Sequence, residues 1–136
     1  MRAPAAGVVR RVGEGTPEAV LGAPRWGLAG LGNHVVMEVA SGEFLFIGYL
    51  RLGTVTAGER VVAGQVLGHV GNSGNSSEPH VHLHLQDTMQ PYFGEAIPFY
   101  FSWYQEDGTL VSQGMPEGGL EKGRYVGDQV RHRSSE

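Results

Sequence analysis

Short apolar runs rich in β-branched and aromatic residues alternate with glycine-containing turns along most of the chain. Glycines recur at short intervals between these runs, where the chain must reverse. This pattern is typical of short β-strands joined by tight turns. The histidine-rich run 80–85 begins directly after Pro79. We predict strands over 34–39, 44–50, 55–61, 62–68 and 80–85.

An apolar period of 3.6 residues is not sustained over a helical length anywhere before Leu85. The segment 13–31 is rich in Gly and Pro and is expected to be a long loop. Beyond Gln86 most of the aromatic residues gather, and 99–104 reads as a further strand. Several short strands with regular turns predict an all-β fold, a sandwich or barrel of antiparallel sheets with long loops and little helix.

The chain has 136 residues, a formal net charge of −4 and no cysteine. This length predicts one domain, which we place at 1–126, with the aromatic extension 91–126 packed on it and a frayed polar tail at 127–136. The acidic balance without a basic run argues against a nucleic-acid partner. The lack of a long apolar stretch argues against a transmembrane segment. The oligomeric state does not follow from the sequence.

The N-terminal residues show no apolar signal-peptide core, which taken literally predicts a cytoplasmic protein. However, Val8, Val9 and Val12 read as a strand that the chain enters without any preceding segment. A truncated sequence would also explain such a start.

His80, His82 and His84 occupy alternate positions of one predicted strand. All three would project from one face, with Cα atoms of neighbours roughly 6.5–7 Å apart, while the aliphatic residues between them face the other way. Two such imidazoles can converge on one metal ion, or one can bind it while the other acts on substrate or water. The alternative is a solvent-facing decoration of an edge strand. Three histidines of one strand rarely reach the same ion, so another ligand is needed; His34 is a candidate, although it fits a turn-side polar role equally well.

The ordered combination of 32–37, 55–70 and 71–82 resembles the lysostaphin/LytM-type zinc endopeptidases. The match extends over about 3–85 and includes an opening strand with an Ala-Pro pair. The resemblance implies a duplicated hybrid motif of β-strands, a zinc ion and cleavage of peptide cross-links in peptidoglycan. It also implies a location in the cell envelope or outside the cell.

Carried onto this chain, the resemblance implies that His82 is a zinc ligand and that His80 is the general base or transition-state stabiliser. His84 stands where the family often has Glu. Further metal or substrate contacts are predicted at His84 and His34 and, in the loop beside this strand, at Asn72, Ser73 and Asn75.

Two departures from the family pattern bear on catalysis. The family's other two zinc ligands belong to a His-x-x-x-Asp motif upstream of the first strand, which this sequence does not contain, so the ligand set is incomplete. A further catalytic histidine of the family falls on Tyr49. Tyrosine can donate a hydrogen bond to an oxyanion, but it is a poor base at neutral pH.

These observations leave two main hypotheses. We expect a catalytically impaired relative that binds cell-wall peptide or glycan or a regulatory partner; the alternative is an active zinc endopeptidase. A biotinyl or lipoyl carrier, which shares the glycine-spaced motif, is rejected because its modified lysine would need an exposed hairpin tip and the chain's only lysine is Lys122. A sugar phosphotransferase subunit with a phosphorylated His69 or His84 is disfavoured by the motifs at 71–82.

Overall fold

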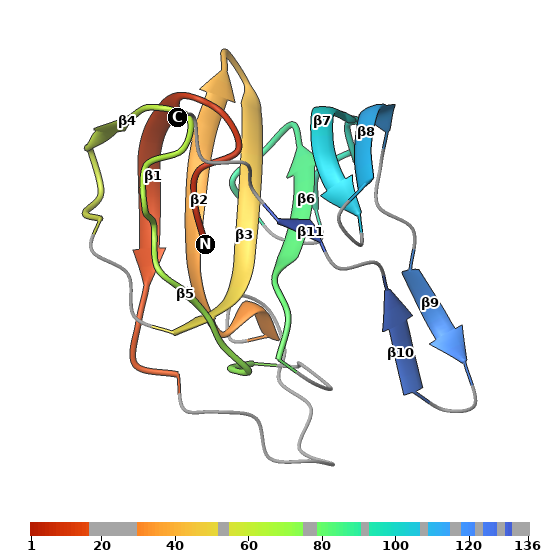
Figure 1. The fold of residues 1–136 in the computed structure, drawn as a ribbon. Helices are drawn as coiled ribbons and strands as arrows, with labels where there is room; N and C mark the ends of the chain where they lie inside the picture. The colour runs from red at the N-terminus through yellow and green to blue at the C-terminus, as the bar shows by residue number, and fades with distance from the viewer. Residues whose placement is uncertain are drawn as a thin grey trace. The chain divides into compact units, whose positions relative to one another are not determined.

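The computed structural model describes residues 1–16, 30–51, 55–74, 79–90, 93–106, 109–114, 118–121, 124–127 and 130–131. Their regular structure is almost entirely β-strand, which confirms the predicted all-β class (Figure 1). No helix among these residues is long and apolar enough to cross a membrane. The strands are β1 (Gly7–Gly13), β2 (Asn33–Ala40), β3 (Glu43–Arg51), β4 (Arg60–Val61), β5 (His69–Val70), β6 (His82–Gln86), β7 (Phe101–Glu106), β8 (Thr109–Gly114), β9 (Gly118–Glu121), β10 (Arg124–Gly127) and β11 (Val130–Arg131).

The larger of two compact units, Met1–Ile97, is built on one antiparallel sheet. Its strand order is β4-β1-β2-β3-β5, and β6 pairs with β3 beside β5. Strands β2 and β3 form a hairpin closed at Gly42, whose φ of 72° suits glycine and strains other residues. The sheet therefore places β6 directly against the long strand β3.

Both faces of this sheet bury apolar residues. Leu31, Val36 and Phe46 form a buried cluster on the face that includes His84. The opposite face carries a further apolar core. Val35, Met37 and Ile47 are buried on it, and each is at most 2% exposed. The chain between β4 and β5 crosses the front of the sheet in Figure 1. Backbone hydrogen bonds join this crossing segment to the first residues of the chain, from Ala3 N to Gln65 O and from Leu67 N to Met1 O. The predicted glycine-spaced steps at 55–68 thus act as the cover of the core, with little strand of their own.

The second unit, Pro98–Glu136, contains two smaller antiparallel sheets. One has the order β11-β7-β8, and the other is the pair β9-β10. Strand β7 (Phe101–Glu106) overlaps the strand predicted at 99–104 and begins and ends two residues later. The predicted packing of 91–126 on the main domain and the fraying of 127–136 remain predictions.

The expected strands at 34–39 and 44–50 correspond to β2 and β3. The histidine strand pairs with β3 only from His82 onward, because His80 forms an isolated bridge with Gly71 instead. Within the predicted loop 13–31, residues 17–29 lie outside the described residues, and 30–31 form a short 3-10 turn.

Candidate functional site

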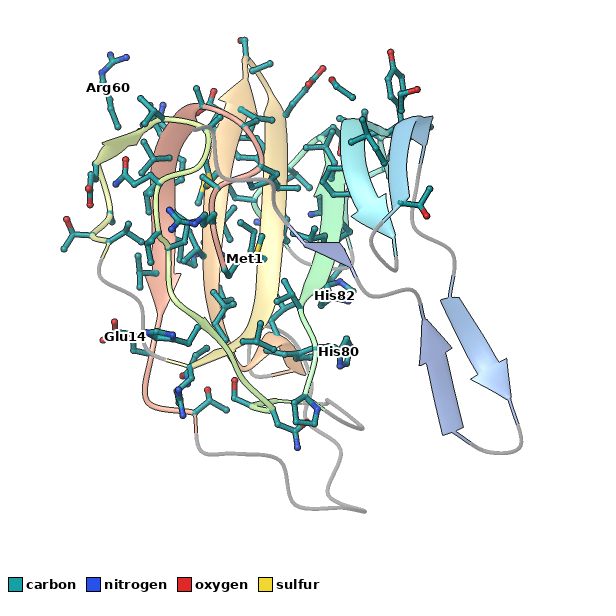
Figure 2. All side chains as sticks on the ribbon, viewed as in Figure 1. Met1, Glu14, Arg60, His80 and His82 are labelled. Carbon is teal, nitrogen blue, oxygen red and sulfur yellow. The ribbon has the colours of Figure 1, made fainter. Side chains whose placement is uncertain are left out.

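Strand β6 presents its polar residues on one face of the sheet. His82 pairs with Gly48, His84 with Phe46 and Gln86 with Phe44 of β3. Because side chains alternate along a strand, these three polar residues share the face opposite Leu83 and Leu85. The two labelled histidines, His80 and His82, follow one another along the segment that leads into β6 (Figure 2).

Gly48 keeps the space beside His82 free. A Cβ built on Gly48 would lie 3.1 Å from the backbone oxygen of Leu31 and 3.6 Å from the Cβ of His82. The chain at Leu31 therefore approaches the sheet closely at the position paired with His82. A Cβ at position 48 would therefore press on the Leu31 oxygen, whereas it would make ordinary contact with the Cβ of His82.

A β-bulge places Tyr49 beside these histidines. Gly48 and Tyr49 of β3 stand opposite the single residue His34 of β2, because the register shifts between Asn33 and Val35. The bulge lies where the edge of β3 passes from β6 to β5, since Gly48 pairs with β6 and Leu50 with β5. Bulges of this kind bend a strand and redirect a side chain.

Tyr49 has a φ of 61°, and no other non-glycine residue of the described chain has a positive φ. Bulky residues rarely adopt this conformation, which costs on the order of 1–3 kcal/mol and persists where the surroundings enforce it. The Tyr49 ring meets the His80 ring edge-on at 4.9 Å between centroids and the His82 ring at 5.4 Å. The strained backbone thus holds the tyrosine against both histidines.

The other end of the polar face is a line of hydrogen bonds. His82 Nε2 and His84 Nδ1 are 2.7 Å apart, and His84 Nε2 lies 3.2 Å from Gln86 Oε1. The His84 ring also stacks on Phe46, with centroids 4.6 Å apart and an interplanar angle of 10°. Both ring nitrogens of His84 are therefore within hydrogen-bond distance of another side chain.

The surroundings of His82 favour its neutral form. Burial, and then the positive charges that His84 and His80 carry when protonated, lower the pKa of His82 from 6.5 to about 4. Burial also lowers the pKa of His84, against a smaller opposing effect of its hydrogen bond to Gln86. Neutral imidazole is the form that binds metals and accepts protons.

Three of the remaining predicted contacts, His34, Ser73 and Asn72, are buried or partly buried within the fold. His34 is 5% exposed, its Nδ1 lies 2.8 Å from Gly32 O, and its buried Nε2 has no hydrogen-bond partner among the described residues. Ser73 is fully buried, and its hydroxyl donates to Leu50 O and accepts from Asn33 N. Asn72 is partly buried, and its Oδ1 has no hydrogen-bond partner in the described part of the chain. Asn75 lies outside the described residues.

A catalytic zinc takes three protein ligands and keeps a position open for water. In the described part of the chain, no group of three or more His, Cys, Asp or Glu side chains could hold a metal ion. His82 and His80 alone do not meet this requirement. The described donor set therefore does not fit a catalytic zinc.

The model of peptidase family M23 matches residues 1–93, which is more than half of the chain. The chain belongs to peptidase family M23. This result confirms the resemblance to lysostaphin/LytM-type enzymes and relates the chain to peptidoglycan-cleaving M23 peptidases. No curated protein sequence matches the chain significantly.

Solved M23 structures share the fold. A mutant catalytic domain of the prophage-encoded M23 protein EnpA from Enterococcus faecalis is 29% identical over 71% of this chain, with a TM-score of 0.56. The catalytic domain of the antimicrobial peptidase lysostaphin from Staphylococcus simulans is 21% identical over 71%, also with 0.56, and LytU is 20% identical over 71%, with 0.53. The chain spans 64%, 65% and 59% of these three structures.

Two features of this M23 site were not predicted. Gln86 is 5% exposed and continues the alternation of His80, His82 and His84, so its period-2 spacing was the signal that could have identified it. The bulge at Gly48–Tyr49 left no such signal, because the offset between β2 and β3 depends on their pairing.

Proposed function

We propose that this M23 domain binds cell-wall peptide at Tyr49, His80 and His82 and is catalytically impaired. The observation that supports this most directly is the contact of the Tyr49 ring with both histidine rings, at the position where the family resemblance implies a histidine. The relation of the chain to peptidoglycan-cleaving peptidases suggests peptidoglycan as the ligand.

The replacement at position 49 argues for impaired catalysis whatever further metal ligands a longer protein would supply. A phenol has an ordinary pKa near 10, so Tyr49 donates a hydrogen bond at neutral pH and does not accept a proton as imidazole does. Loss of a general acid or base typically lowers the rate about 10²–10⁴-fold. The family resemblance implies zinc, which the donor set of the described residues does not fit.

The three residues are suited to binding. Tyr49, His80 and His82 are each partly exposed, so a ligand can reach their rings without unfolding the sheet. Neutral His82 offers a hydrogen-bond acceptor to the N–H groups of a peptide, and an aromatic ring adds contact area at a small cost in conformational entropy. The exposed His69 on β5 lies outside this group and offers a matched control.

The test combines metal analysis, sedimentation with insoluble peptidoglycan and release of soluble peptides. We expect no stoichiometric zinc, measurable sedimentation and no release. His82→Ala should reduce the bound fraction at least several-fold, whereas His69→Ala should leave it unchanged. Stoichiometric zinc together with peptide release would overturn the proposal in favour of an active endopeptidase. Equal binding by both variants would show that the site does not bind the cell wall.

A further inference from the structure

The side-chain amide of Gln86 has its orientation fixed by two backbone carbonyls. Its Nε2 lies 2.8 Å from Thr88 O and 2.7 Å from Gln90 O. Carbonyl oxygens only accept hydrogen bonds, so the amide nitrogen must face them, and the reversed amide would bring three oxygens together. Gln86 Oε1 is therefore the atom that faces His84 Nε2.

The turn that supplies these carbonyls is itself attached to the sheet. Arg11 of β1 donates from its guanidinium to Met89 O over 3.2 Å. On the far side, Gln86 forms a bridge with Ala96, and Asp87 Oδ1 accepts from Glu95 N at 2.9 Å. Several independent contacts thus hold the segment that orients the Gln86 amide.

The fixed amide of Gln86 determines the direction of the hydrogen bond between Gln86 and His84 and, through it, of the one between His84 and His82. Because Gln86 Oε1 can only accept, His84 Nε2 must carry the proton, and in neutral His84 the Nδ1 atom then holds a lone pair. That lone pair faces His82 Nε2 at 2.7 Å, so His82 Nε2 must be the donor. Stacking on Phe46 keeps the His84 ring in the plane that this requires.

We propose that His84 and Gln86 are positioning residues that hold neutral His82 in one tautomer, with its proton on Nε2 and its lone pair on Nδ1. This assigns Nδ1 as the atom of His82 that meets a ligand. It also gives His84 a role inside the protein, in place of the direct metal or substrate contact expected from the sequence. The use of that lone pair in ligand binding rests on the proposed function; the tautomer itself does not.

Nitrogen-15 NMR of the histidine rings, recorded on the full chain without metal or ligand at pH 7.5, tests the inference. Two-bond correlations distinguish a protonated ring nitrogen from one with a lone pair. We expect a single Nε2–H tautomer for both His82 and His84. A proton on Nδ1 of either ring in the unmodified protein would overturn the proposal.

Two variants at position 84 separate positioning from simple packing. His84→Phe keeps an aromatic ring over Phe46 but removes both nitrogens, so we expect a second tautomer to appear at His82. His84→Gln can restore the line, because one amide provides both an acceptor for His82 and a donor to Gln86. We expect it to return His82 to one tautomer, and His69→Phe to change nothing.

An unchanged His82 tautomer in His84→Phe would overturn the proposal, as would a mixed tautomer in His84→Gln. Because His84→Gln tests the same line of hydrogen bonds, its spectra keep the proposal testable even if His84→Phe does not fold. Failure of peptidoglycan binding would leave these tautomers unaffected, so the two proposals fail separately.

Discussion

The two faces of β6 are held in place by different forces. On one face, Leu83 and Leu85 oppose Ile47 and Leu45 of β3, and contact depends only on shape and area. On the other, His82 and His84 join a line of hydrogen bonds in which each atom has an assigned role as donor or acceptor. Apolar burial is non-directional, whereas a line of hydrogen bonds requires each donor to face an acceptor, so a change at one atom changes the direction of the others. The chemical state of the histidines should therefore depend on the second face. Stability should depend on apolar burial, which the first face provides and to which Val36 and Phe46 add on the second.

The largest effect should come from the apolar face. Ile47 is fully buried, so Ile47→Ala removes buried methyl and methylene groups and leaves a cavity, at an expected cost of about 2–5 kcal/mol in the free energy of unfolding. Urea unfolding followed by far-ultraviolet circular dichroism measures this cost. The tautomer of His82 should stay unchanged if the variant remains folded.

Val62 provides the matched control for that experiment, because its side chain is 67% exposed. Val62→Ala should change the free energy of unfolding by less than about 0.5 kcal/mol. Similar losses of unfolding free energy at positions 47 and 62 would mean that the crossing segment between β4 and β5 does not cover the apolar face as described.

The second effect, on pH dependence, comes from the polar face. The pKa of His82 is about 4 in the folded chain and 6.5 in the unfolded chain, so between these values the unfolded chain binds a proton that the folded chain does not. Lowering the pH from 6.5 to 4 should therefore reduce stability, while above 6.5 this contribution is complete. Burial lowers the pKa of His34 and His84 as well, which acts in the same direction.

Unfolding of the chelator-treated protein, measured from pH 8 to pH 4, should show this loss. Each histidine contributes a slope of at most about 1.4 kcal/mol per pH unit. His82→Asn should flatten the slope, whereas His69→Asn should preserve it. An identical slope in both variants would show that His82 is not kept neutral by its surroundings.

The same contrast explains how much the sequence could predict. The strands β2 and β3 and the all-β class follow from short apolar runs between glycine-containing turns, which are local features of the sequence. The shared face of His82 and His84 follows from the two-residue period, because a strand has the same period wherever it pairs. The contact of Tyr49 with His80 and His82 depends on the offset of β3 against β2 and on the change of its partner from β6 to β5. Strand pairing sets both, within the hairpin for the offset and between distant segments for the change of partner, and no local pattern records it.

The smallest expected effect on stability concerns the positive φ of the Tyr49 backbone. Tyr49→Asn and Tyr49→Val both remove the ring, but asparagine tolerates a positive φ whereas a β-branched residue does not. The asparagine variant should therefore be the more stable by about 1–2 kcal/mol in urea unfolding. At Phe44, which has an ordinary backbone on the same strand, valine should be favoured over asparagine instead. If valine were favoured at both positions, the backbone of Tyr49 would be that of a regular strand, and its ring would need another reason to lie between the two histidines.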